Sequence, residues 1–341
     1  MKRYYFLLVP LFAVLYSSCT KISDDGPTPD PLQGLLLTDS LTMYTGNVVK
    51  LNVKVTPASY DTTKLVWKSS DTSVISVTNR GVITAKNEGT SQISLSNVAQ
   101  TKSVSCLITV KDSLKVGLLA YYPFDNSAND FSGHNYNGTA HDITNIADRF
   151  GKSNSAYSFN GTSSFITVSD KQALRLNGID FTINYWIKLN NYSPSYGTTV
   201  LSKRDIGYQQ GWITGVGGVL NAGSIVGKSG TITYNVAGGT DPFAYGQLVC
   251  GLSAWHMLTV VYNYDSNEVT LYVDGVFDRI SKNIPTPNGN VTKDLYIGAD
   301  SQGLANPSYY DYLTKGGLDD IRIYKRALNI HEVHKLFVAT K

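Results

Sequence analysis

The side chains in this sequence that could do chemistry or bind a ligand are acids, histidines and tyrosines. Of its 26 acidic residues only three are glutamates, Glu88, Glu268 and Glu332. A glycosidase needs two carboxylates that act on one bond, about 5 Å apart in retaining enzymes. Asp319 and Asp320 are adjacent on a predicted strand, so we expect them to point to opposite faces. The acids therefore argue against hydrolysis.

The five histidines also fail to form a catalytic arrangement. None is paired with a serine or cysteine nucleophile in a recognisable motif. His331 and His334 lie three residues apart on a predicted helix, where they could bind a metal or simply face solvent. We predict no catalytic residue.

Tyrosines are concentrated in two polar segments. Tyr309, Tyr310 and Tyr312 lie in the string "NPSYYDY", and Tyr192 and Tyr196 lie in another predicted loop. A tyrosine ring offers an apolar face that can stack on a sugar and a hydroxyl that can hydrogen-bond to it. Loops on a rigid scaffold often carry binding residues. These five tyrosines are our candidate ligand-binding residues, unless the rings fold back onto the domain.

Length and composition indicate a globular protein of two domains. The chain has 341 residues, of which 42% are hydrophobic and 16% charged, and a single core rarely grows to that size. The net charge is only +3, with no basic run longer than Lys325-Arg326. Nucleic-acid binding is disfavoured because such proteins concentrate basic residues on one face.

The N-terminus has the layout of a cleaved secretion signal. Basic residues precede an apolar run over residues 4–15, and the letters "SSC" end at Cys19. This ending resembles a bacterial lipobox, in which the cysteine is acylated, although Tyr16 departs from the usual pattern. We predict a signal peptide over residues 1–18 and lipidation at Cys19. The alternative is an ordinary signal peptide with an incidental cysteine.

Residues 19–34 are expected to form an acidic and proline-rich linker. Asp24 and Asp25 resemble the export tag that directs bacterial lipoproteins to the outer face of the outer membrane. Several acyl chains on one cysteine would make the anchor stable, and the proline-rich stretch over residues 26–31 would act as a stiff spacer. We therefore expect a protein that is lipid-anchored in the outer membrane and exposed at the cell surface.

Residues 35–112 carry the pattern of a small β-sandwich. Residues 49–55 alternate apolar and polar side chains, which predicts one half-buried strand. The string "VKVTPASYDTTKLVWKSSDTSVISVTNRGVITAKNEGTSQISL" resembles the bacterial immunoglobulin-like group 2 family, which implies a spacer unit. Trp67 is expected to pack in the sandwich. Cys106 falls on an apolar row, so we expect a core residue without a disulfide to Cys250.

Residues 116–341 are strand-like almost throughout. Phe181, Ile183, Ile187 and Leu189 follow a strand period, and Asp274-Gly275 is a hairpin signal. Only residues 328–337 have a helical pattern, so the fold class is all-β. The strings "LLAYYPFDNSANDFSGHNYNGT", "GKSNSAYSFNGTSSFITV", "FTINYWIKL", "AWHMLTVVYN", "VTLYVDG", "LYIGAD" and "GGLDDIRIYKRALNIHEV" resemble the laminin-G-like, concanavalin-A-like jelly rolls. We expect a larger jelly-roll sandwich after the small one.

The same resemblance implies a structural calcium ion (Ca2+). Its ligands would be Asp125, the carbonyl near Gly161, and Asp319. On the strand period Asp319 shares a face with Ile321 and Ile323, so its carboxylate would point toward the core, where a cation would offset the cost of burying it. The alternative is a hydrogen-bonded or arginine-paired aspartate.

Fold does not fix function, since this jelly roll hosts lectins, glucanases and adhesins. The absence of a catalytic motif and the presence of tyrosine-rich loops together predict a non-catalytic surface protein that binds glycan or polysaccharide. Its partners could include an outer-membrane uptake or adhesion system. A protein-binding adhesin or structural surface module is the alternative. A glycoside hydrolase of the same fold is the second alternative.

Overall fold

A computed structural model describes most of the chain beyond the predicted linker, in two compact units. The small unit lies within the first 108 residues and the large unit contains residues 109–341. Cys19 and the whole predicted signal peptide lie outside the described residues. No helix within the described part of the chain is long and apolar enough to span a membrane. The described residues are 32–195, 197–205, 210–219, 228–236, 243–306, 308 and 312–340.

The small unit is a sandwich of short antiparallel strands. One sheet has the order β2-β9-β8-β5, the second has the order β3-β7-β6, and β1 pairs with β4 alone. Cys106 is buried and its thiol is free, as is that of Cys250, which confirms the prediction. The strands are β1 (Gly34–Leu36), β2 (Ser40–Tyr44), β3 (Val48–Lys50), β4 (Lys54–Thr56), β5 (Leu65–Ser69), β6 (Ile75–Val77), β7 (Val82–Ala85), β8 (Gly89–Asn97) and β9 (Ser103–Lys111).

The alternating row over residues 49–55 is not one strand, and that prediction was wrong. β3 pairs with β7, whereas β4 pairs with β1 in a different sheet. Leu51, between the two strands, donates its N–H to the carbonyl of Gly81 at 2.9 Å and is buried. Burial alternates only from Leu51 onward, and Val49 is exposed. The apolar and polar letters alternate across a change of sheet, and periodicity alone cannot distinguish this case from a single strand.

Trp67 packs against the cluster of Leu32, Leu65 and Leu95, as predicted. Gly81 lies beside the indole with φ +73°, and a Cβ there would come within 2.6 Å of the ring. Glycine is therefore required at this turn for both its backbone conformation and its lack of a side chain.

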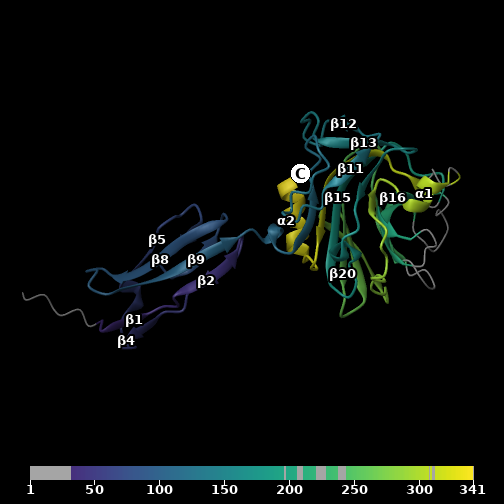
Figure 1. The fold of residues 1–341 in the computed structure, drawn as a ribbon. Coiled ribbons are helices and arrows are strands. Elements are labelled where there is room, and N and C mark those ends of the chain that lie inside the picture. Colours follow the sequence, from purple (N-terminus) through teal and green to yellow (C-terminus); the bar gives the residue numbers. More distant parts are fainter. Residues whose placement is uncertain are drawn as a thin grey trace, which may run out of the picture. The chain divides into compact units, whose positions relative to one another are not determined.

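The large unit is a jelly-roll sandwich of two antiparallel sheets (Figure 1). The eight-stranded sheet has the order β12-β13-β24-β15-β20-β21-β22, with β10 also paired to β24; the seven-stranded sheet has the order β11-β14-β23-β16-β17-β18-β19. The elements are β10 (Leu118–Tyr122), β11 (Gly138–His141), β12 (Thr144–Ile146), β13 (Ala156–Asn160), β14 (Phe165–Val168), β15 (Phe181–Leu189), β16 (Gly197–Arg204), β17 (Gly211–Gly217), β18 (Thr231–Val236), β19 (Phe243–Val249), β20 (His256–Asn263), β21 (Glu268–Val273), β22 (Val276–Lys282), β23 (Leu295–Ile297), β24 (Lys315–Tyr324), the 3-10 helices η2 (Ser113–Lys115) and η3 (Gln172–Arg175), and the helices α1 (Ser301–Ala305) and α2 (Ile330–Thr340).

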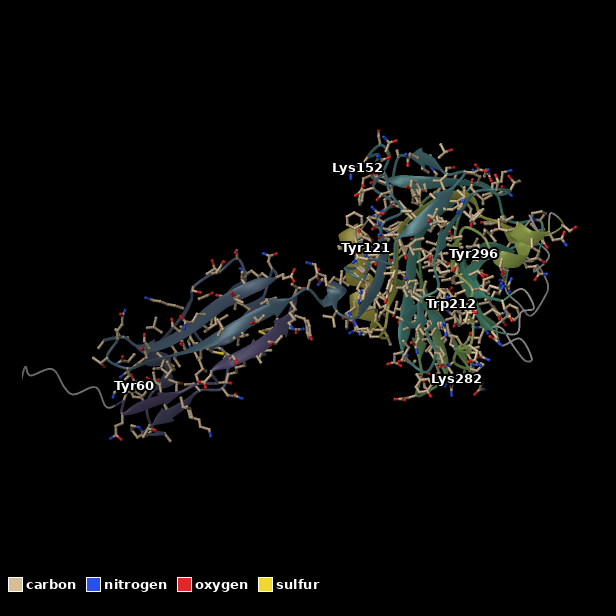
Figure 2. The ribbon with its side chains drawn as sticks, viewed as in Figure 1. Tyr60, Tyr121, Lys152, Trp212, Lys282 and Tyr296 are labelled. Atoms are coloured by element: carbon tan, nitrogen blue, oxygen red, sulfur yellow. The ribbon has the colours of Figure 1, made fainter. Side chains whose placement is uncertain are left out.

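The core of the large unit lies between its two sheets (Figure 2). The predicted row on β15 is buried there, together with Tyr185. Two of the large polar rings in the core have hydrogen-bond partners: the Trp212 indole N–H donates to the carbonyl of Leu174 at 3.1 Å, and the Tyr185 hydroxyl lies 3.2 Å from that of Thr214. The predicted hairpin at Asp274-Gly275 joins β21 to β22.

Helix α2 covers the other face of the eight-stranded sheet. Its buried residues, among them Val333 and Leu336, join a second cluster with Trp186 of β15 and Tyr324 of β24. A capping box starts the helix: Glu332 donates its N–H to the side chain of Asn329, and the Glu332 carboxylate accepts the N–H of Asn329. His331 and His334 are exposed on this helix.

A β-bulge in β24 reverses the expected direction of Asp319. Trp186 pairs with Asp319 and Asn184 with Arg322, so two residues of β24, Asp320 and Ile321, face a single residue of β15. Asp320 has φ +49°, a conformation that aspartate tolerates better than most residues. Asp319 therefore lies on the face of Trp186. The prediction that it shares a face with Ile321 and Ile323 was wrong, because the bulge shifts the alternation by one residue.

Candidate functional site

An open pocket of about 450 Å3 lies at one edge of the seven-stranded sheet. Its walls come from the end of β11, the turn between β13 and β14, the start of β14, and helix α1. The lining side chains combine aromatic rings, hydroxyls and a carboxylate: His141, Asp142, Thr162, Ser163, Phe165 and Leu304.

Side-chain hydrogen bonds hold the turn that forms one wall. The Asn160 side-chain carbonyl accepts the N–H groups of residues 162–164 at 2.8 to 3.1 Å. Gly161 adopts φ +78° in this turn, which a side chain would oppose. The Ser164 hydroxyl then donates to the carbonyl of Asp142 at 2.5 Å. This bond joins the turn to the end of β11, so the pocket's two walls have a fixed spacing.

Aromatic rings form a half-exposed surface in and beside the pocket. His141 of β11 is the register partner of Phe165 in β14, and their rings stack with centroids 4.3 Å apart and an interplanar angle of 19°. Tyr296 of β23 is labelled in Figure 2, and its ring centroid lies 6.3 Å from that of Phe165. Burial and the nearby Asp294 raise the pKa of Tyr296. Its hydroxyl is therefore protonated at neutral pH and can donate a hydrogen bond.

The pocket has one carboxylate among its described lining residues, that of Asp142. No ion pair between described residues involves Asp142, and its side chain is exposed. Rings that stack, hydroxyls that donate or accept, and a carboxylate that accepts together suit the faces and hydroxyls of a sugar. Two carboxylates would be needed to cleave a glycosidic bond.

The predicted tyrosines are only partly placed. Tyr196, Tyr309 and Tyr310 lie outside the described residues. Tyr312 is half-buried and immediately precedes Leu313, which forms a bridge with Thr199 of β16. The tyrosine-rich segment follows helix α1 in the sequence, and Leu304 of that helix lines the pocket.

Tyr192 is an anchoring residue in this structure. Its hydroxyl donates to the carbonyl of Cys250 at 2.8 Å, and its ring packs against the core and against Gly230. A Cβ at Gly230 would come within 2.8 Å of that ring. For this residue the ring folds back onto the sandwich, which was the alternative interpretation.

Sequence reasoning missed His141, Asp142 and Phe165 as a group. His141 and Phe165 are 24 positions apart, and only the pairing of β11 with β14 makes them neighbours. No local motif predicts that register, because strand pairing depends on which long-range partner a strand finds.

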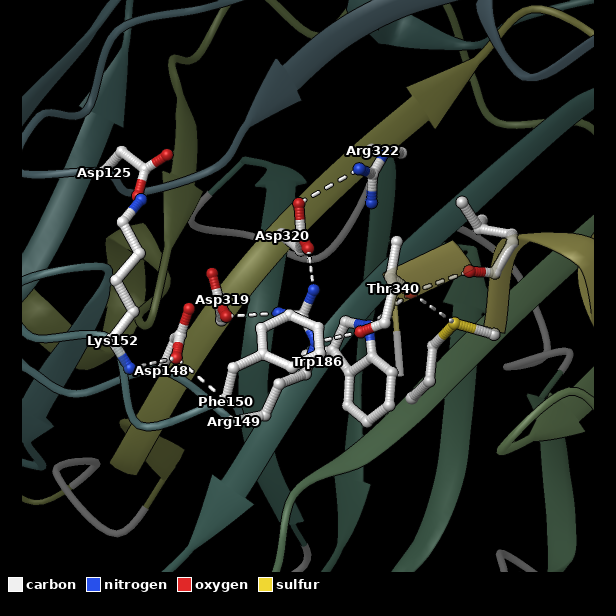
Figure 3. A network of polar contacts seen from close by, with 12 residues as sticks. Asp125, Asp148, Arg149, Phe150, Lys152, Trp186, Asp319, Asp320, Arg322 and Thr340 are labelled. Carbon is white, nitrogen blue, oxygen red and sulfur yellow. Dashed lines mark hydrogen bonds and ion pairs between the residues drawn. The ribbon is translucent and has the colours of Figure 1, made fainter. Parts of the chain in front are cut away.

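Arg149, also missed, lies at the centre of a buried ion network (Figure 3). Its two terminal nitrogens pair with Asp319 and Asp320, and its Nε donates to the carbonyl of Thr340. The side chains of all three charged residues are at most 8% exposed. The two acids therefore converge on one guanidinium, and the prediction that they point to opposite faces was wrong because of the bulge at Asp320.

The network around Asp320 is completed by further partners. The Asp320 carboxylate accepts a hydrogen bond from the Tyr121 hydroxyl at 2.7 Å and pairs with Arg322 at 3.0 Å. Burial first, and the charge of Asp320 second, raise the pKa of Asp319 to about 7. The two aspartates are sealed by arginines rather than open to a substrate, so their convergence does not create a hydrolytic pair.

The two acids predicted to hold calcium are each paired with a cation. Asp125 pairs with Lys152 at 2.6 Å, and Asp319 pairs with Arg149 (Figure 3). Gly161, the third predicted position, lies beside the aliphatic part of the Lys315 side chain. Calcium needs six to eight oxygen ligands, and no cluster of three or more histidine, cysteine or acidic side chains that could hold a metal occurs in the described part of the chain. In these positions the residues do not fit a calcium ion. Calcium binding by this domain stays a prediction.

A second ion network lies around Asp170. The Asp170 carboxylate pairs with Lys203 at 2.7 Å and with Arg175 at 2.5 Å. The Lys203 side chain is fully buried and also donates to the carbonyl of Lys293. The hydrogen bond from Arg175, with that from Lys203, lowers the pKa of Asp170 to about 2. Here one carboxylate pairs with two cations, whereas in the first network the guanidinium of Arg149 pairs with two carboxylates.

The fold defines a two-sheet jelly-roll domain that follows an immunoglobulin-like sandwich in the sequence. A family model described as the concanavalin A-like lectin/glucanases superfamily matches residues 160–334, and a model of the bacterial Ig-like domain (group 2) matches residues 36–108. The chain therefore belongs to the concanavalin A-like lectin/glucanases superfamily, with an Ig-like domain before that module. Both findings confirm the predicted architecture.

Solved structures share the fold of this chain. The binding domain of Paraclostridial Mosquitocidal Protein 1 is 20% identical, with a TM-score of 0.52, over 67% of this chain and 53% of that chain. The binding domain of botulinum neurotoxin serotype D/C is 13% identical, with a TM-score of 0.50 and the same coverage. This chain thus spans about half the length of those structures. No curated protein matches the sequence.

Proposed function

We propose that this protein is a cell-surface lipoprotein whose jelly-roll domain binds glycan without cleaving it. The observation that carries the proposal is the pocket beside the His141–Phe165 stack, which offers aromatic faces together with hydroxyls and a single carboxylate. The superfamily includes lectins and glucanases by its own description. Within it, one carboxylate in the described lining supports a binder rather than a hydrolase.

The tyrosine-rich segment would extend the same site. Tyr309, Tyr310 and Tyr312 follow helix α1 closely in sequence, and α1 contributes Leu304 to the pocket. If these rings bind sugar as predicted, they would contact further units of the same glycan, so we expect an oligosaccharide rather than a single sugar to be the ligand. The superfamily likeness supports such a surface without identifying the glycan.

The cellular location of the protein is proposed from its first 34 residues. Acylation at Cys19 would anchor the chain in the outer membrane, and the linker and Ig-like domain would separate the jelly roll from the membrane surface. Metabolic labelling with an alkyne fatty acid tests the anchor: the wild-type chain should be labelled and Cys19→Ser should not. Labelling of both would contradict lipidation at this residue.

A glycan array probed with the purified protein tests the binding function. We expect binding to a restricted set of glycans, weakened by Phe165→Ala and His141→Ala but not by His331→Ala, which removes an exposed histidine on α2. Absence of binding to every glycan, with specific capture of a protein, would replace the proposal by the adhesin alternative. Release of reducing sugar from a polysaccharide panel would instead favour the hydrolase.

A further inference from the structure

The buried acids of β24 require a positive charge. Asp319 and Asp320 are only 2% and 6% exposed, and a buried carboxylate without a partner is strongly unfavourable. The resemblance to laminin-G-like jelly rolls predicts a calcium ion near Asp319. The guanidinium of Arg149 already contacts both carboxylates, so the charge that a metal would bring is supplied by the chain itself.

Arg149 also joins three separate parts of the domain. It projects from the loop between β12 and β13, binds two acids of β24, and donates to the carbonyl of Thr340 at the end of α2. The C-terminal end of a helix carries partial negative charge, so a cation there is favourable. The planar guanidinium donates in several directions at once, much as a metal ion accepts several ligands.

Neighbouring groups hold the guanidinium in place. It lies over the ring of Trp186 at 4.8 Å and over that of Phe150 at 4.5 Å, both within cation–π range. The Asp148 carboxylate accepts the N–H groups of Phe150 and Lys152 at 2.8 Å, which fixes the turn that carries Arg149. These contacts form a site that is built around an arginine.

Trp186 links this site to the helix. Its indole N–H donates to the Thr340 hydroxyl at 3.0 Å, and its ring stacks on Phe337 with centroids 5.7 Å apart. Trp186 therefore fixes the side chain of Thr340, the residue whose carbonyl accepts the hydrogen bond from Arg149. Loop, strand and helix all converge on the guanidinium.

We propose that Arg149 is the structural cation of this jelly roll, and that it joins β24 to α2 in place of a bound calcium ion. The domain therefore folds and keeps its stability without a metal at Asp319. This inference is independent of the glycan proposal, since it concerns the opposite sheet.

The unmodified protein provides the first test. Its melting temperature should change by less than about 1 °C between excess EDTA and about 5 mM calcium chloride. A calcium-dependent rise in melting temperature that Asp319→Asn abolishes would overturn the proposal. This measurement needs no variant that could fail to fold.

Two substitutions at Arg149 provide the second test. Arg149→Met leaves two buried acids without their shared cation, so we expect the melting temperature to fall by about 10 °C. Arg149→Lys keeps the charge but cannot contact both acids and the carbonyl together, so it should recover part of that loss. The control is Lys325→Met, which removes an exposed cation beside the same strand.

The comparison between the two substitutions decides the role of the charge. Equal melting temperatures for Arg149→Lys and Arg149→Met would show that the charge plays no part and would overturn the proposal. So would an Arg149→Met protein as stable as Lys325→Met. An insoluble Arg149→Met protein beside a soluble Arg149→Lys protein would support it.

Discussion

Carboxylates occur in two contrasting settings in the jelly roll. Around Arg149 the carboxylates of Asp319 and Asp320 are buried and compensated by guanidinium groups. In the pocket the carboxylate of Asp142 is exposed, and no described residue pairs with it. Both regions also contain stacked aromatic rings. What differs is whether the chain satisfies its own charges or leaves them for a ligand.

This difference separates stability from binding. A sealed network contributes to folding because each group removed leaves a buried partner unpaired. An exposed acid costs little to keep and is available to a ligand's hydroxyl groups. Substitutions in the first region should therefore change unfolding but not glycan affinity, and substitutions in the second should do the reverse.

After the Arg149 substitutions, the largest effect in these two regions is expected for Asp320→Asn. Asparagine tolerates the left-handed backbone at this position. It lacks the charge and the second oxygen with which the carboxylate pairs with Arg149 and Arg322 and accepts the Tyr121 hydroxyl. We expect a loss of about 3 kcal/mol in the free energy of unfolding, measured by urea denaturation. Asp265→Asn, in an exposed turn, is the control. A loss no greater than the control's would mean that the network contributes no stability.

Acid should weaken the second ion network, around Asp170, which is partly exposed. The pKa of Asp170 in the folded chain is about 2, below its ordinary value of 3.8, so the unfolded chain binds a proton first as pH falls. The stabilisation is complete above about pH 5 and is lost progressively as pH falls through about 2, an effect of about 2 kcal/mol. Asp170→Asn should remove this part of the pH dependence of urea unfolding. An unchanged pH profile in Asp170→Asn would show that other acids dominate.

In the pocket, His141→Ala should weaken binding to an array-selected glycan about tenfold, or about 1.4 kcal/mol. The stacked ring is lost, but few core contacts are, so the melting temperature should stay within about 1 °C of wild type. Titration calorimetry and thermal unfolding measure the two quantities. A melting temperature that falls while affinity holds would place His141 with the structural residues.

The smallest effect is expected for Asp142→Asn. An amide oxygen still accepts a hydrogen bond but without the charge, so affinity for a neutral glycan should fall about threefold. The same calorimetric titration measures it, with Asp265→Asn again as the control. If Asp142→Asn instead strengthened binding to a neutral glycan, the carboxylate would not be a ligand-binding group.

Local patterns in the sequence predicted much of the fold. The apolar period at residues 181–189, the hairpin at Asp274-Gly275 and the helical tail all occur in the structure, because each depends on neighbours within a few positions. The alternation at residues 49–55 misled, since the chain changes sheets midway. Family likeness added the two-domain architecture, which the family models confirm.

The candidate site was much less predictable. Three of the five tyrosines lie outside the described residues, and Tyr192 anchors to Cys250. The His141–Phe165 stack depends on the pairing of β11 with β14. Such pairing is chosen among distant segments, so a single sequence shows no signal for it.

Composition, strand periodicity and turn residues predicted an all-β chain, and the resemblance of its motifs to two families added the two sandwich domains. The direction of Asp319 was settled only in three dimensions. One bulged residue, Asp320, turns two adjacent acids to the same face, where a loop residue 170 positions away supplies their cation. Strand periodicity is local, but register and charge pairing depend on which distant segments meet when the chain packs.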